Sequence, residues 1–225
     1  MTTISSATNP LIKEIRRIQA RKAPGLFVAE GEDLISEAAA QGWKPRHHLR
    51  AGVDVDPAVL AKVSALGSGT RELAIYEERW AEPTGPLSVA LWGIKDPGNV
   101  GTVLRSAFAF RASSVVLGPE TADPYGAKAV RASMGAIFAV PVARVSSVSE
   151  LHGTTIALAA RTGEVLSGPV DGAVTIVVGS EREGLPEDVA NGCTKSMHIP
   201  IENESLNAAM AATLALYELS RVANG

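Results

Sequence analysis

The chain of 225 residues has little cysteine and few aromatic side chains. Cys193 is the single cysteine, and aromatic residues make up 4% of the chain, whereas hydrophobic residues as a whole make up 46%. One cysteine excludes a disulfide framework and indicates a reducing compartment. With so few aromatic rings, the core must consist mostly of Ala, Val, Leu and Ile. That composition is typical of α/β proteins, whose strands are covered on both faces.

Long apolar runs and common ligand fingerprints are also missing. No run reaches the roughly 18 apolar residues of a membrane-spanning helix. We expect no secretory signal either, because the first residues do not combine a charged segment with an apolar one. We therefore expect a cytoplasmic protein with no membrane partner. The four His residues and the Cys show no metal-ligand spacing, so no metal is expected. The glycine fingerprints of dinucleotide and nucleoside triphosphate sites are absent as well, which argues against an ordinary nucleotide-binding enzyme such as a dehydrogenase.

The chain also lacks a strong net charge. At −3, the chain lacks the positive balance of a protein that coats nucleic acid through salt-dependent contacts. Basic residues nevertheless gather near the N-terminus, with Glu14 as their one acidic neighbour: Lys13, Arg16, Arg17, Arg21 and Lys22. This cluster has two interpretations, a solvated helix face or a surface that guides RNA. Under the second interpretation, Lys13, Arg16 and Arg17 would contact the RNA.

The order of helix and strand signals divides the chain into two parts. Residues 1–82 read as a small α/β domain that begins with a helix capped by Asn9. The Pro and Gly residues of 83–86 mark a linker. Over residues 87–225, buried strands alternate with helices, one of which is expected over 124–137. This alternation predicts a mostly parallel sheet with helices on both faces.

Polar loops follow strands of the expected sheet, at the carboxyl ends where ligands bind in such folds. In the first, "KDPGNVGTVLR", Asn99 can cap a helix, Gly101 allows a close backbone approach, and Arg105 lies further along the helix. In the second, "VVGSEREGLPEDV", Glu181 follows Gly179 closely. Each loop also has a purely structural interpretation. The first would be a capped helix with a surface Arg, and the second a strand–turn–helix connection. The latter leaves Glu181 unexplained.

The third loop, "HIPIENESLN", precedes a helix rich in Ala. Either Ser205 or Asn207 can cap that helix. One cap needs one such side chain, and the segment offers several more polar ones, so we expect it to face a ligand as well. Arg131 stands out on an otherwise apolar helix, and its structural interpretation is an Arg at the edge of the core whose head reaches solvent.

Taken together, these loops resemble the three ordered motifs of the SpoU family of SPOUT RNA ribose 2′-O-methyltransferases. The resemblance is carried by "NVGTVLR", "VVGSEREGL" and "IPIENESLNAAMA", and also by "DPGNVGTVLRSAFAF" and "KAVRASMGAIFAVPV". It is dense over residues 87–222. The segments "NPLIKEIRRIQ" and "FVAEGEDLISEA" are similar to the family's ribosomal-protein-like (L7Ae/L30e-like) substrate-binding domain.

The resemblance implies a fold, a cofactor and a set of site residues. The sheet would end in a deep trefoil knot of the SPOUT type, and the knot loops would bind the methyl donor S-adenosylmethionine at Gly179, Ile199 and Leu206. The catalytic set that the motifs carry over comprises Arg105, Asn99, Glu181, Ser205 and Asn207. Arg131 matches an Arg that some members use near the substrate. A homodimer is implied too, with the active site near the subunit interface.

The expected reaction is methylation of a ribose 2′-hydroxyl in structured RNA. Ribosomal RNA is favoured over transfer RNA, because the N-terminal domain is common among the family's ribosomal enzymes. Since a guanidinium stays protonated, Arg105 would grip a phosphate or stabilise the developing alkoxide, and a neutral Arg105 that takes the proton is the competing idea. Two alternatives remain: a non-catalytic RNA-binding or ribosome-assembly factor of the same fold, and an ordinary nucleotide-binding α/β enzyme such as a dehydrogenase.

Overall fold

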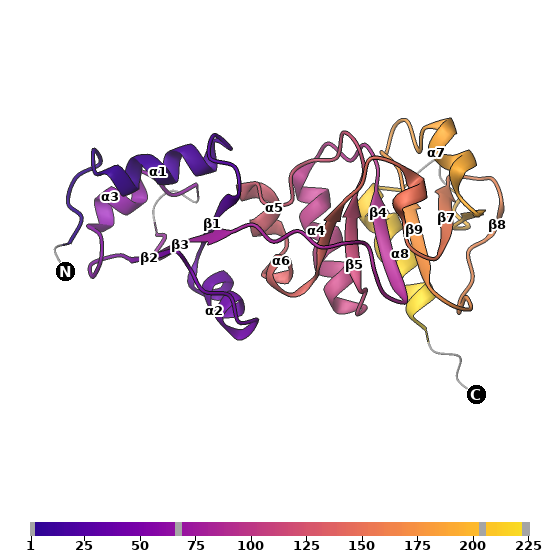
Figure 1. Cartoon of the computed structure of the whole chain (residues 1–225), viewed down its shortest axis with the longest axis horizontal. Helices are drawn as coiled ribbons and strands as arrows, with labels where there is room; N and C mark the ends of the chain where they lie inside the picture. Colours follow the sequence, from indigo (N-terminus) through magenta and orange to yellow (C-terminus); the bar gives the residue numbers. More distant parts are fainter. Residues whose placement is uncertain (1–2, 66–68, 203–205, 222–225) are drawn as a thin grey trace.

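The computed structural model describes residues 3–65, 69–202 and 206–221 of the chain. Figure 1 shows two β-sheets, one toward each end of the long axis of the molecule. The smaller sheet has the order β1-β3-β2 with both neighbouring pairs antiparallel: β1 (Leu26–Glu30), β2 (His47–Arg50) and β3 (Glu72–Glu77). Its helices are α1 (Pro10–Gln19), α2 (Glu32–Ala40) and α3 (Pro57–Ala61).

The predicted N-terminal helix is confirmed in α1. Asn9 Oδ1 accepts a hydrogen bond from the Leu11 amide at 2.9 Å, and Pro10 begins the helix, where its missing N–H costs nothing. One face of α1 is buried in the core of the N-terminal part, and the basic side chains occupy the opposite, exposed face: Lys13, Arg16 and Arg17.

The larger sheet has the order β6-β5-β4-β9-β7-β10-β8, and its neighbouring strands pair in parallel. Its strands are β4 (Leu87–Leu91), β5 (Ser114–Leu117), β6 (Val142–Arg144), β7 (Thr154–Ala159), β8 (Glu164–Val165), β9 (Val174–Val178) and β10 (Lys195–His198). The accompanying helices are α4 (Pro97–Ala109), α5 (Ala127–Ala132), α6 (Ala136–Ala139), the short 3-10 helix η1 (Val148–Glu150), α7 (Glu187–Gly192) and α8 (Ala208–Ser220). The predicted parallel α/β arrangement is therefore confirmed.

Helices cover both faces of the larger sheet, as the continuous apolar strands predict. In β4, Val89 and Leu91 join the cluster that contains α4 and α8, whereas Ala90 between them joins the cluster that contains Val189 of α7. The deep trefoil knot and the ribosomal-protein-like character of the N-terminal part stay predictions. No helix among the described residues combines the length and the apolar character needed to cross a bilayer.

The single helix expected over 124–137 is wrong, because the chain breaks it into α5 and α6. Met134 and Gly135 stand at the break with φ of 49° and 92°, in the left-handed region that no α-helix continues through. Buried Ser133 tightens the turn, since its Oγ donates to the carbonyl of Val130 at 2.7 Å. Local hydrogen bonding of this kind competes with regular helix.

The apolar core is shared between the two parts of the molecule. Aromatic rings gather where they meet, with neighbouring centroids 4.9 to 6.2 Å apart: Phe27, Trp43, Tyr76, Tyr125 and Phe138. The indole N–H of Trp43 also donates to the carbonyl of Phe138 at 2.8 Å. Burial of this aromatic surface stabilises the contact between the two parts of the molecule.

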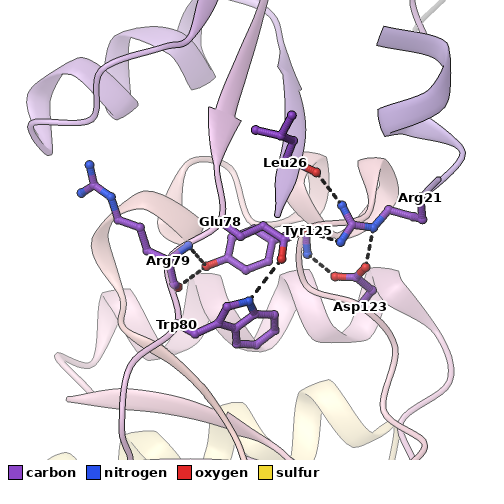
Figure 2. Close-up of polar contacts among 7 residues, drawn as sticks. All are labelled: Arg21, Leu26, Glu78, Arg79, Trp80, Asp123 and Tyr125. Carbon is purple, nitrogen blue, oxygen red and sulfur yellow. Dashed lines mark hydrogen bonds and ion pairs between the residues drawn. The ribbon is translucent and has the colours of Figure 1, made fainter. Parts of the chain in front are cut away.

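Polar contacts at the same place are shown in Figure 2. The guanidinium of Arg21 pairs with Glu78 and, at 2.6 Å, with Asp123 on the opposite part. The hydroxyl of Tyr125 donates to the carbonyl of Arg79 and accepts from its amide at 3.2 Å. Arg21 therefore joins the two parts of the chain and does not belong to the exposed basic face of α1.

Replacing Tyr125 with Phe should change how stability depends on pH. Burial raises the pKa of Tyr125 to about 12, so the neutral phenol stabilises the fold below pH 10 and this contribution fades as pH rises from about 10 to about 12. Tyr125→Phe should cost about 1–3 kcal/mol at pH 8, because both backbone groups of Arg79 lose a partner. Urea unfolding of both proteins should show this difference shrinking between pH 10 and pH 12. Parallel pH profiles would contradict it.

Candidate active site

The first polar loop begins α4 at the carboxyl end of β4. Asp96, not Asn99, caps this helix: its Oδ1 accepts from the Gly98 amide at 2.8 Å. The expected cap at Asn99 is therefore wrong, and its amide group is available for other contacts. Lys128 Nζ also lies 2.7 Å from Asp96 Oδ1, and this contact holds the pKa of Asp96 below its usual range.

Three segments that are distant in the sequence meet beside this loop. Asn99 Nδ2 donates to Glu181 Oε1, and Asn207 Nδ2 lies 3.2 Å from Asn99 Oδ1 and 3.4 Å from Glu181 Oε1. Glu181 follows β9, and Asn207 stands directly before α8. The sheet places these loops at one edge, because the carboxyl ends of parallel strands lie together. The predicted convergence of these three residues is a feature of the structure.

Asn207 performs two tasks at once. Its Oδ1 caps α8 by accepting from the amides of Ala209 and Met210 at 3.0 and 3.2 Å, while its Nδ2 faces Asn99 and Glu181. Helix capping therefore uses one end of this amide and leaves the other end to the site. Ser205, the other expected cap and catalytic residue, lies outside the described residues.

Glu181 is placed at the positive end of α8. The amide of Ala208 donates to its Oε1 at 3.4 Å, so that the carboxylate is stabilised by the helix N-terminus and by two amide side chains. A strand–turn–helix connection alone does not explain an acidic residue at position 181. The hydrogen bonds of Glu181 to the segments of Asn99 and Asn207 explain it.

A cavity of about 410 Å³ opens beside this cluster, at the carboxyl end of β9. The positions expected to bind the donor, Gly179, Ile199 and Leu206, all line it, and so does Glu181. Gly179 has a packing reason to lack a side chain, because a Cβ there would lie 2.2 Å from the carbonyl carbon of Gly184. The turn 180–184 can form the wall of the cavity only with glycine at 179.

Arg105 does not join the hydrogen bonds of this cluster. It is exposed and lines a second cavity, of about 700 Å³, together with Arg131 and Lys128. Gly98, Thr102 and Arg105 share one face of α4, since they are four and three residues apart. That spacing can be read from the sequence, and it could have identified Thr102 as a further residue lining this cavity.

The close approach predicted at Gly101 is confirmed. A Cβ there would lie 2.4 Å from the carbonyl oxygen of Ala129, so glycine lets α4 pack directly on α5. This contact fixes Arg105 and Arg131 on neighbouring helices. In the described part of the chain, no three His, Cys, Asp or Glu side chains lie together in a way that suits a metal ion.

Comparison with known proteins gives the class of this protein. Residues 86–217 match the model of the SpoU rRNA Methylase family. The chain belongs to this family of methyltransferases, as the three motifs indicated.

Two relatives and one solved structure illustrate the similarity. The chain is 34% identical to an uncharacterized tRNA/rRNA methyltransferase of Mycolicibacterium vanbaalenii, over 98% of this chain and 76% of that protein. It is 28% identical to the 23S rRNA (guanosine(2553)-2′-O)-methyltransferase RlmP of Bacillus subtilis, over 97% of this chain and 99% of that protein. The AdoMet-bound rRNA methyltransferase structure from Sinorhizobium meliloti is 29% identical, with a TM-score of 0.86 and 96% of each chain covered.

Proposed function

We propose that this protein transfers a methyl group from S-adenosylmethionine to a ribose 2′-hydroxyl of structured RNA, and to ribosomal rather than transfer RNA. The observation that carries the proposal is the meeting of Asn99, Glu181 and Asn207 beside a cavity at the carboxyl end of the sheet. The name of the Bacillus subtilis relative, a 2′-O-methyltransferase of 23S rRNA, supports both the reaction and the kind of RNA.

The 410 Å³ cavity fits S-adenosylmethionine in size and in chemistry. Small-molecule sites range over roughly 300–1,000 Å³. Ile199 and Leu206 supply apolar walls for the adenosine, while Glu181 and Glu183 supply carboxylates that suit a sulfonium and an ammonium group. When bound, the donor supplies a methyl group that its sulfonium sulfur makes electrophilic. The solved relatives in complex with AdoMet support this choice of donor.

The chain's own residues orient and activate the acceptor. Asn99 and Asn207 fix the carboxylate of Glu181, so that its charge has one position in the site. Arg105 grips a phosphate of the RNA or stabilises the oxygen as the 2′-hydroxyl loses its proton. Because a guanidinium is a very poor base, the proton leaves through that phosphate rather than to Arg105.

The two parts of the chain divide the work. Residues 1–82 form a domain that binds the substrate RNA, and residues 83–86 link it to the catalytic domain. Residues 87–225 form that catalytic domain, which binds the donor within the trefoil knot. The exposed basic face of α1, formed by Lys13, Arg16 and Arg17, contacts RNA phosphates. Arg131 contacts RNA phosphates as well. The reaction takes place in the cytoplasm.

The protein acts as a homodimer whose subunits meet on α4 and α8. Apolar side chains are exposed there, 43 to 59% of each being accessible: Phe108, Met210, Leu214 and Tyr217. Met210, Leu214 and Tyr217 share one stripe of α8, since they are four and three residues apart. The stripe adjoins Asn207, so a second copy packed on it would border the site. Contiguous exposed apolar surface of this kind marks an interface.

Introducing a charge into this stripe should break the dimer. Leu214→Glu would bury a carboxylate in the interface, and light scattering after gel filtration should show the mass falling from two chains to one. Val53→Glu is the matched control, because Val53 is 58% exposed but lies between β2 and α3 in the N-terminal part. Equal masses for both variants and the unmodified protein would count against this interface.

Calorimetry tests the proposed donor directly. Titration of S-adenosylmethionine into the protein should show saturable binding at one site per chain, whereas NAD⁺ should give only heat of dilution. The absence of donor binding by a protein whose circular dichroism shows it folded would remove the proposal.

A further inference from the structure

The 700 Å³ cavity has walls from both parts of the molecule. Val28 of β1 and Leu34 of α2 come from the N-terminal part, and Arg105 of α4 and Arg131 of α5 from the larger one. Figure 1 shows α5 beside β1 where the two parts meet. A cavity at such a junction is a common position for a ligand.

Two guanidinium groups on this cavity have no hydrogen bond or ion pair within the described residues. Both Arg105 and Arg131 are exposed, whereas Lys128 beside them is held by Asp96 at 2.7 Å. Among the described residues that line the cavity, Glu30 is the one with an acidic side chain. Its carboxylate already accepts from Gln19 at 2.9 Å, from Ser64 at 2.7 Å and from the amide of Ala65. Two guanidiniums in this situation suit phosphate groups, which they bind through paired N–H donors.

The exposed side chain of Met134 lines the cavity with these two Arg residues, and its backbone conformation is strained. Met134 is 59% exposed and has φ of 49°, a left-handed conformation that costs a residue with a side chain about 1–2 kcal/mol. Its amide donates to the carbonyl of Arg131 at 3.2 Å, which closes the turn after α5. Strain of this kind persists only where the surroundings impose it, and it is a reason to look for function.

The N-terminal part helps to impose this conformation. A Cβ on Gly135 would lie 2.6 Å from Cγ of Glu37, so α2 packs directly on the residue after Met134. The turn that exposes Met134 is thus clamped between α5 and α2, and Met134 completes an apolar wall with Val28 and Leu34.

We propose that this cavity accepts one unpaired nucleotide of the RNA, with its base against Met134 and its flanking phosphates on Arg105 and Arg131. The inference rests on the proposed function and specifies its substrate as a nucleotide outside a helix. A paired base is unavailable to a pocket, so the nucleotide must be looped out or single-stranded. The thioether of Met134 suits the face or edge of any base, so this wall selects for an unpaired base and not for its identity.

Binding of three labelled RNAs, measured by fluorescence anisotropy, tests the proposal: octauridylate, the same ribose-phosphate chain without bases, and a short duplex with the same number of phosphates. Met134→Ala should weaken octauridylate binding about 3- to 10-fold and leave the abasic chain and the duplex unchanged. Arg131→Ala should weaken both single strands and lower the salt dependence. Val53→Ala, an equally exposed apolar residue away from the cavity, should change nothing.

A second variant separates contact from folding. Met134→Gly removes the left-handed strain, so its melting temperature should stay the same or rise while octauridylate affinity falls as in Met134→Ala. Equal octauridylate affinities for Met134→Ala, Val53→Ala and the unmodified protein would overturn the inference, and so would equal losses on octauridylate and the abasic chain. If the unmodified protein methylates RNA and these binding results fail, only this inference falls. If the binding results hold and no methyl is transferred, only the proposed reaction falls.

Discussion

Replacing Arg105 with Ala is expected to lower the rate of methyl transfer about 10²- to 10³-fold, the usual effect of losing one group that stabilises charge in the transition state. Arg105 lines the 700 Å³ cavity and not the 410 Å³ one, so donor affinity should remain as it was. Initial rates at saturating donor, together with calorimetric donor affinity, measure the two quantities separately.

The lysine variant and a surface control make this result specific. Arg105→Lys keeps the charge but loses the paired donors, so a grip on phosphate predicts a large loss for Lys as well. Near-full activity of Arg105→Lys with unchanged RNA affinity would contradict that grip. Lys95→Ala is the control, because this side chain lies just before α4 and, among the residues that the structure describes, forms only an exposed pair with Glu120 at 3.4 Å.

Replacing Gly179 with Ala should weaken donor binding about 10- to 100-fold. The added Cβ would lie 2.2 to 2.4 Å from backbone atoms of Gly184 and Leu185, so the turn that walls the cavity must move. Overpacking of this kind lowers the free energy of unfolding by about 1–3 kcal/mol. Donor calorimetry on both proteins measures the loss.

Gly153→Ala is the matched control for this substitution. A Cβ at Gly153 would lie 2.3 Å from the carbonyl oxygen of Ala173, so this substitution also produces a clash with backbone. The clash lies at the amino ends of β7 and β9, whereas the one at Gly179 lies at the carboxyl end of β9. Both variants should lose stability, and only Gly179→Ala should lose donor affinity. Equal donor affinities in the two variants would contradict a donor site at the carboxyl end of β9.

Local patterns in the sequence predicted most elements of the larger sheet. The apolar runs became β4, β5, β7 and β9, because buried parallel strands need apolar side chains on both faces. Their order could not be predicted in the same way. β9 lies between β4 and β7, and pairing between strands so far apart in the sequence leaves no local signal. The contact between the two parts was missed for the same reason.

Individual residues show the same limit within the site. Asn99 and Asp96 are both good caps, and the sequence offered no means to prefer Asp96; the structure shows that Asn99 contacts Glu181 instead. Arg21 was counted among the basic residues of the N-terminus, although it pairs with Glu78 and Asp123. The motif residues Asn99, Glu181 and Asn207 were identified through family resemblance, and the packing of three loops gives the physical reason for their meeting.

Nucleoside mass spectrometry tests the central claim most directly. Ribosomal RNA from cells that lack the gene would be incubated with the protein and S-adenosylmethionine carrying a deuterated methyl group, then digested to nucleosides. The account predicts the deuterated methyl on a ribose, in one 2′-O-methylnucleoside, and far less of it with Arg105→Ala. Label on a base, or no label with a protein that binds the donor, would contradict it.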